Sequence, residues 1–260
     1  MFRKLWVMGF SVLLHMNAHA SDMVFGTDEL PLVWSSIITL SGGPAWASPA
    51  QNQYLYPNAP PVANPTLPPL VIDYFNYNSP TGILATGEIF FGLQHIIPPG
   101  FLIGELGIGL AGATDALATG VIDINGVPAA NTFSYKVDHG RVELKGKLIG
   151  AWYKQVQPYI SGSFGAGFNN SHAYVPTTIN MDLFPPAFFA SNTNIAFSYT
   201  LGAGVQTKLT PHWQVGVGYE FADWGKNFLG ADPVTLLNGP GLTHLYTNEL
   251  LFSLSYLFGC

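Results

Sequence analysis

The sequence predicts an all-β protein, a closed antiparallel eight-stranded transmembrane β-barrel in a bacterial outer membrane. Three observations lead to this fold class: an export signal opens the chain, charged residues make up only 9% of it, and eight stretches alternate in polarity. Alternation with a period of two is the pattern of a strand whose two faces meet different surroundings. Ordinary soluble domains carry about 25% charged residues. The composition therefore favours an apolar surface that faces lipid.

Residues 1–20 have the parts of a cleavable signal peptide. Arg3 and Lys4 precede the short apolar stretch 5–14, and Ala18 and Ala20 are the small residues expected at a cleavage site. The apolar stretch is shorter than the ~20 residues that a spanning helix needs, so we expect export without a membrane anchor. We expect residues 21–33 to form a short periplasmic segment and residues 34–260 to form the barrel.

Charge and cysteine content narrow the class further. Without residues 1–20, seven basic residues (nine less Arg3 and Lys4) face fifteen acidic ones, a net charge of −8. Nucleic acid is excluded as a partner, because phosphate binding needs clustered Lys and Arg. Cys260 is the only cysteine, so no intramolecular disulfide can form. This leaves Cys260 either as a free thiol or in an intermolecular disulfide.

The eight expected strands follow one another in a regular order. In the clearest of them, Trp213, Val217 and Phe221 lie on one face, while Gln214 and Glu220 lie on the other. In the first strand, Ile37 is the one residue that breaks the alternation. The expected strands are residues 34–46, 85–95, 101–113, 133–148, 159–169, 197–206, 213–221 and 246–258.

The less apolar face of these strands decides between a soluble and a membrane barrel. A soluble β-domain would place Lys, Glu, Thr and Arg there, whereas this face carries mostly Gly, Ser, Ala and Thr with a few charges of both signs. Small residues suit the narrow lumen of an eight-stranded barrel. The connections alternate in length as well. Short ones follow the second, fourth and sixth strands, and the long ones, residues 47–82, 114–132, 170–194 and 225–245, are expected to be extracellular loops.

Aromatic residues lie where the strands would cross the two membrane interfaces. Such girdles are typical of outer-membrane barrels. The residues that we assign to the girdles are Trp34, Trp46, Trp152, Trp213, Tyr256 and Phe258.

Nine charged residues are expected to point into the lumen. Charges sealed inside a barrel must be paired, because an isolated buried charge is strongly disfavoured. We therefore predict an ion-pair network that plugs the lumen, with a proton or ion path as the alternative. The nine residues are Glu88, Glu105, Arg141, Glu143, Lys145, Lys147, Lys208, Glu220 and Glu249.

The expected outer loops are unusually rich in apolar and aromatic residues. Two interpretations stay open: the loops pack on one another over the barrel mouth, or they form a surface for a partner. The aromatic residues concerned are Tyr54, Tyr56, Tyr74, Phe75, Tyr77, Phe184, Phe188 and Phe189.

Five segments carry a resemblance to a known family. They are LSGGPAW (40–46), KGKLIG (145–150), PYISGSFGAGFN (158–169), HWQVGVGYEFADWGK (212–226) and HLYTNELLFSLSYLF (244–258). As an ordered set, they resemble the eight-stranded outer-membrane β-barrels of opacity-type surface proteins, most narrowly a group from intracellular γ-proteobacteria. The resemblance implies a role at a host-facing surface and no catalytic residues. The chain departs from the family pattern at its end, where Gly259 and Cys260 follow the terminal aromatic Phe258.

The sequence offers little for catalysis or cofactor binding. GIGLAG (107–112) matches a dinucleotide-binding pattern, but it lies within a strand. The histidines are widely spaced, so we expect no metal, cofactor or enzyme activity. The leading hypothesis is a structural or adhesive surface protein whose partners are outer-membrane lipid, lipopolysaccharide and a host surface molecule. The alternatives are a narrow transporter of small hydrophobic molecules and a lipid-modifying enzyme that would use His139, Ser171 and His172 at the outer rim.

Overall fold

The computed structural model divides the chain into two compact units, Met1–Leu32 and Val33–Cys260. It describes residues 34–49, 52–55, 73–78, 82–98, 100–124, 126–151, 156–178, 187–232 and 239–258. The expected signal peptide 1–20 and segment 21–33 lie outside the described residues, as do Tyr56, Trp152, Phe184 and Cys260. Within the described part, no helix is long and apolar enough to cross a membrane.

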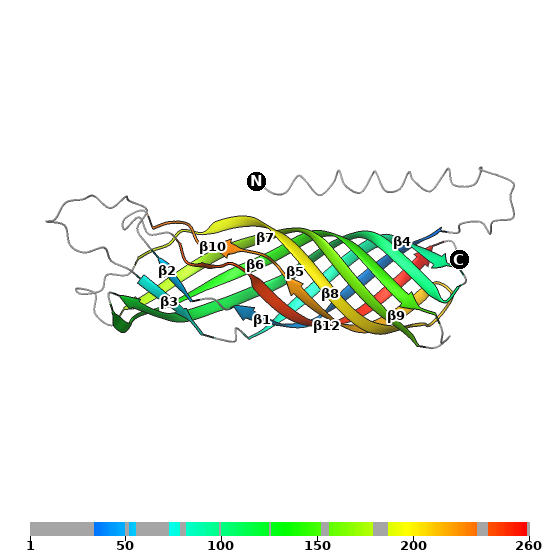
Figure 1. Cartoon of the computed structure of the whole chain (residues 1–260), viewed down its shortest axis with the longest axis horizontal. Helices are drawn as coiled ribbons and strands as arrows, with labels where there is room; N and C mark the ends of the chain where they lie inside the picture. Colours follow the sequence, from blue (N-terminus) through cyan, green and yellow to red (C-terminus); the bar gives the residue numbers. More distant parts are fainter. Residues whose placement is uncertain are drawn as a thin grey trace. The chain divides into compact units, whose positions relative to one another are not determined.

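Eight strands form one antiparallel ring, as the sequence predicts. Their order around the ring is β1, β4, β5, β6, β7, β8, β9 and β12, and β12 pairs back onto β1. Figure 1 shows these strands tilted along a single barrel. Their bounds are Trp34–Pro49 (β1), Ile83–Ile97 (β4), Leu102–Ile124 (β5), Val127–Gly150 (β6), Gln157–Thr178 (β7), Asn192–Lys208 (β8), Trp213–Asp223 (β9) and Leu245–Phe258 (β12).

The ring closes with a stagger of ten residues. Pairing followed from Gly42 through β4, β5, β6 and β7 reaches Ile195 on β8. Pairing followed the other way, through β12 and β9, reaches Val205. A stagger of this size tilts eight strands by about 40°. Alternate side chains then point into a narrow lumen or out of the barrel wall.

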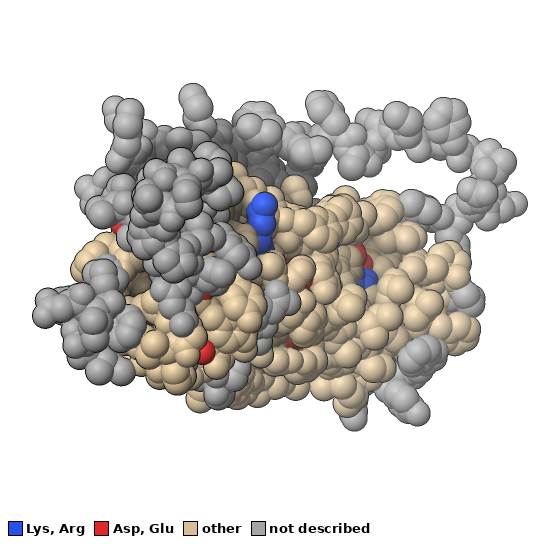
Figure 2. Space-filling model, turned by 60° about the vertical axis from the view of Figure 1, so that its left-hand side comes forward, with Lys and Arg blue, Asp and Glu red and all other residues tan. Residues whose placement is uncertain are grey.

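Aromatic side chains mark the two edges of the apolar wall. Trp34, Trp213 and Phe258 lie exposed near the end of the short connections, which we call the turn end; Trp46 lies exposed toward the opposite, loop end. Residues 34 and 46 are twelve positions apart on β1. At a rise of ~3.3 Å per residue and a tilt of about 40°, they span about 30 Å. This matches the hydrocarbon thickness of a bilayer, and Figure 2 shows a wall with very few charged side chains.

Three strands continue far beyond this wall at the loop end. The expected loop 114–132 is wrong: β5 runs to Ile124 and β6 starts at Val127, so that two residues, 125–126, connect them. Gly126 has a φ of 82°, the left-handed conformation that a tight hairpin turn requires. The expected loop 170–194 is also shorter, because β7 extends to Thr178. The sequence missed these extensions because the apolar and polar faces exchange places there.

This exchange of faces is clearest on β6. Within the wall, Leu144 and Leu148 point outward and are exposed, whereas beyond it Phe133, Tyr135 and Val137 point inward and are buried. Water replaces lipid as the surroundings outside the bilayer, so the apolar face must turn inward. Register shifts accompany the exchange, at residues 113–116 between β5 and β6 and at 134–136 between β6 and β7.

The extensions enclose an apolar core, and we call this part the cap. It comprises the outer parts of β5, β6 and β7, the strands β2 (Gln53–Leu55) and β3 (Asp73–Tyr77), the ribbon β10 (Asn227–Phe228) with β11 (Gly241–Leu242), and residues 187–190. β3 pairs with β5, and β2 pairs with β3. Figure 1 shows the cap strands at the end of the barrel opposite the C-terminus. The main buried residues of the cap are Leu55, Phe75, Tyr77, Ile122, Phe133, Tyr135, Phe189, Leu229 and Leu242.

Candidate functional site in the barrel lumen

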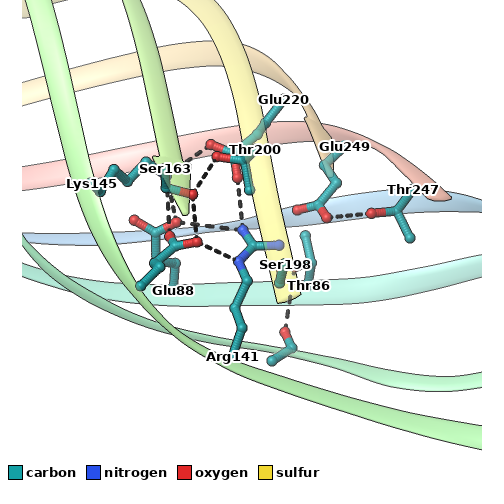
Figure 3. Close-up of polar contacts among 12 residues, drawn as sticks. Thr86, Glu88, Arg141, Lys145, Ser163, Ser198, Thr200, Glu220, Thr247 and Glu249 are labelled. Carbon is teal, nitrogen blue, oxygen red and sulfur yellow. Dashed lines mark hydrogen bonds and ion pairs between the residues drawn. The ribbon is translucent and has the colours of Figure 1, made fainter. Parts of the chain in front are cut away.

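A cluster of charged side chains lies in the lumen. The alternation of β6 points Arg141, Glu143 and Lys145 inward from one strand, while Glu88 enters from β4 and Glu220 from β9. These five residues form the lumen cluster. Figure 3 shows the side chains of Glu88, Arg141, Lys145 and Glu220 meeting between the strands.

Arg141 lies near carboxylates from three strands. Its Nε lies 2.7 Å from Glu143 Oε2, and its Nη2 lies 2.8 Å from Glu220 Oε1 and 3.9 Å from Glu88 Oε2. The guanidinium carbon also lies 4.3 Å from the centre of the Trp224 ring, a cation–π contact. Arg141 is buried, so these partners replace the water that its charge would otherwise require.

Lys145 makes the second bridge of the cluster. Its ammonium group donates to Glu88 Oε2 at 2.6 Å and to Glu220 Oε2 at 2.8 Å. Glu220 thus accepts from both cations through its two oxygens. Ser163 adds a neutral contact, because its hydroxyl donates to Glu143 Oε2 at 2.6 Å and lies 2.8 Å from the hydroxyl of Thr200.

A smaller polar group lies nearer the turn end. Lys147 lies 3.4 Å from Glu105, and its ammonium stands over the ring of Tyr159. Gln94 donates to Glu105 at 2.8 Å. Between this group and the lumen cluster is a cavity of about 50 Å³, lined by acidic, basic and hydroxyl side chains together with Phe90 and Leu251. A space of this size holds only a few water molecules.

Trp224 covers the lumen cluster on the loop-end side. It is fully buried, and its indole N–H donates to the hydroxyl of Thr247 at 2.8 Å. The Thr247 hydroxyl in turn donates to Glu249 at 2.6 Å. Asn169 donates to the carbonyl of Trp224 at 2.7 Å and fixes the segment after β9. The alternation did not assign Trp224 to the lumen, because this residue lies between the expected strand 213–221 and the expected loop 225–245.

The structure brings together most of the nine charged residues that the sequence assigned to the lumen. Seven lie in the two groups above, and Glu249 lies beside them, held by Thr247. Lys208 is the exception. It is the last residue of β8, and it lies exposed at the turn end. Lys208 occupies an inward-facing position of the alternation, but it is not buried because the lumen opens to water at the end of the strand. Among the described lumen residues, five glutamates therefore face three basic side chains.

The aromatic residues of the expected loops divide between the cap core and its surface. Phe75, Tyr77 and Phe189 are buried, and the Tyr77 hydroxyl lies 3.1 Å from that of Tyr135. Tyr74 is half-buried and packs on Tyr54 at 4.6 Å between ring centres. The exposed fraction is 60% for Tyr54 and 63% for Phe188.

The residues considered for an enzymatic site do not converge. Ser171 is fully buried and bonds to Asn227, while His172 is partly exposed and contacts Asp138 on the outside of the barrel. His139 is buried beside Trp224, and neither ring nitrogen has a hydrogen-bond partner. A hydrolytic triad needs these side chains within hydrogen-bond reach of one another; here, adjacent positions on β7 point to opposite faces.

The closed ring and the apolar wall agree with the comparison with known families. A family model described as outer membrane protein beta-barrel domain matches residues 72–258. The chain belongs to this family. As an outer-membrane β-barrel protein, it is placed in the bacterial outer membrane.

Solved structures with a similar fold include other outer-membrane β-barrels. Neisserial surface protein A is 9% identical with a TM-score of 0.39, and the alignment covers 85% of this chain and 96% of that one. The outer membrane protease OmpT from Escherichia coli is 11% identical (TM-score 0.43; coverage 90% and 100%). The attachment invasion locus protein Ail of Yersinia pestis is 12% identical (TM-score 0.30; coverage 86% and 99%). At these identities the likeness concerns the fold alone. No curated protein matches this outer-membrane β-barrel.

Proposed function

We propose that this protein is a non-conducting surface barrel whose lumen is plugged and whose cap presents a binding surface. The observation that carries the proposal is the series of buried contacts along the barrel axis. Ile37, Phe90 and Leu257 form an apolar contact inside the barrel. The lumen cluster follows, and Trp224, which contacts Arg141, belongs to the cap core.

Packing within the cap supports a rigid binding surface rather than flexible loops. A buried core fixes the strands beneath the exposed side chains, so a partner meets a surface that is already ordered and loses less entropy on binding. Tyr54 and Phe188 are exposed aromatic residues on this surface, and aromatic side chains are common binding hot spots. The resemblance to opacity-type surface proteins of intracellular γ-proteobacteria supports a host surface molecule as the partner, with lipopolysaccharide around the barrel.

Two experiments test the two halves of this proposal. In planar bilayers, the purified protein should give no stable conductance, and a steady nanosiemens pore would refute the plug. In whole-cell binding to host cells, the double variant Tyr54→Ser and Phe188→Ser should lose most binding at equal surface expression.

Lys208→Ala is the matched control for the binding experiment, because Lys208 is exposed at the opposite end of the barrel. It should bind like the unchanged protein. Equal binding by the Tyr54 and Phe188 double variant would overturn the assignment of the cap surface. Transport of small hydrophobic molecules is less well supported. Several of the aromatic residues that would line an entrance through the cap, such as Phe75, Tyr77 and Phe189, are instead buried in its core.

A further inference from the structure

Three side chains on neighbouring strands meet on the outside of the barrel, where the wall gives way to the cap. They are Asp115 on β5, Asp138 on β6 and His172 on β7. One potential ligand atom from each lies within 4.8 Å of the other two. All three residues are at least partly open to solvent, so an ion has access to them. None belongs to the lumen cluster or the cap core.

The contacts of this cluster leave it with excess negative charge. Lys136 lies 3.2 Å from Asp115, and it is the one lysine or arginine with a recorded ion pair to the cluster within the described residues. His172 Nδ1 lies 3.7 Å from Asp138 and makes a long 3.3 Å contact with the carbonyl of Asn170. With a neutral imidazole, two carboxylates face one ammonium group, so the cluster with Lys136 carries a charge of −1.

The two carboxyl groups also approach each other closely. One carboxylate oxygen of Asp115 and one of Asp138 lie within 4.8 Å of each other and of a ring nitrogen of His172. A cation between the two carboxylates would remove their mutual repulsion. The requirement is for positive charge at one point, which a divalent ion meets better than a second flexible side chain.

The donor set indicates which ion would fit. Two carboxylate oxygens and one imidazole nitrogen suit Zn²⁺ and similar transition ions, whereas Ca²⁺ takes six to eight oxygen ligands. Ligands at about 2.0–2.2 Å from Zn²⁺ lie about 3–4.4 Å apart. The spacing of the cluster needs only small side-chain movements to reach this range.

The backbone around the cluster shows how the fold creates this arrangement. The register shift at 113–116 lies at Asp115, and the shift at 134–136 lies opposite His172. Bulges of this kind re-aim side chains at the point where a strand changes direction. Here they bring together residues from three strands that a regular ladder would separate.

We propose that Asp115, Asp138 and His172 form a binding site for one divalent transition-metal ion of the Zn²⁺ class. The ion ties β5, β6 and β7 together at the base of the cap and leaves at least one coordination position open to solvent or to a lipid phosphate. The wide spacing of the histidines along the chain predicts no metal site. Spacing along the chain does not reveal ligands that come from three different strands.

The test uses the full folded protein in detergent micelles at neutral pH, titrated with Co²⁺ as an absorbing probe and then with Zn²⁺ as a competitor. One equivalent of Co²⁺ should bind, and Zn²⁺ should displace it. Asp138→Asn should weaken binding at least roughly tenfold, and His172→Ala should abolish the visible absorption that reports the nitrogen ligand. Lys136→Gln should strengthen binding several-fold, because it removes the competing ammonium group from Asp115.

The matched control is His244→Ala, since His244 also contacts a carboxylate, Asp223, at 2.8 Å but has no third ligand recorded beside it within the described residues. Its affinity for Co²⁺ should equal that of the unchanged protein. Circular dichroism confirms that each variant is folded, and His172→Gln replaces His172→Ala if the latter is not. No binding below millimolar Co²⁺, or binding unchanged in both His172 and Asp138 variants, would overturn the proposal.

Discussion

Replacing Arg141 by methionine tests whether the lumen cluster stabilises the barrel as a connected network. The substitution keeps a long side chain but removes the charge that lies 2.7 Å from Glu143 and 2.8 Å from Glu220. Breaking a buried ion pair by removing one partner costs about 3–5 kcal/mol, because the other charge stays buried without compensation. The lost contact with the Trp224 ring contributes about 1 kcal/mol of that cost. The free energy of unfolding should therefore fall by about 3–5 kcal/mol.

The measurement is urea unfolding of the protein in lipid vesicles, followed by tryptophan fluorescence. A triple variant, Arg141→Met with Glu143→Gln and Glu220→Gln, removes the uncompensated charges as well and should recover more than half of the loss. Lys208→Met is the matched control: it deletes an exposed cation and should change the unfolding free energy by less than about 0.5 kcal/mol. A loss below about 1 kcal/mol for Arg141→Met, or no recovery in the triple variant, would refute the network.

Three further predictions concern the cap and the wall. Phe75→Ala removes a fully buried cap side chain and should destabilise the cap by about 3–5 kcal/mol, seen as faster amide hydrogen exchange in β3 and the outer half of β5 with the wall unchanged. Burial raises the pKa of Asp73 in the cap to about 6. The stability that this shift contributes is fully present below about pH 4 and is lost as the pH rises through 6. Protease resistance of the cap should therefore be higher at pH 5 than at pH 7.5, and Asp73→Asn should abolish the difference. Gly165→Ala places a Cβ against the backbone of β6 and should impair folding, whereas Gly140→Ala, whose Cβ has ordinary clearance on the outer face, should be tolerated in the same refolding assay.

The wall of the barrel was predictable because each strand there meets lipid on one side and a narrow lumen on the other. That contrast repeats every second residue, so the fold class and the eight strands follow from the alternation alone. The misplaced Ile37 also has an explanation: it points inward and packs on Phe90 and Leu257. The inward orientation of Arg141 and Lys145 follows from the same periodicity. The alternation does not predict which carboxylate each of them contacts, because pairing across the lumen depends on the stagger of the closed ring.

The cap escaped prediction for two physical reasons. In the cap the apolar side chains point inward, whereas in the wall they point outward. Ala116 and Ala118 belong to this inward face, but such small residues are also common in loops, so they did not indicate a strand. The register shift at 113–116 also changes which residues of β5 point inward, from odd-numbered ones in the wall to even-numbered ones in the cap. Extending the pattern of the wall would therefore assign the cap residues of β5 to the wrong face. The cluster of Asp115, Asp138 and His172 was not predicted for the same reason, since the position of Asp115 depends on one of these shifts.

The shared core of the cap limits how the exposed end of this protein can change over evolutionary time. Separate flexible loops can each gain or lose residues independently. Here, segments 53–55, 73–77, 187–189, 227–229 and 241–242 pack against the same strands. An insertion in one of these segments disturbs the others. Within them, sequence variation is expected as substitutions at exposed positions such as Tyr54 and Phe188.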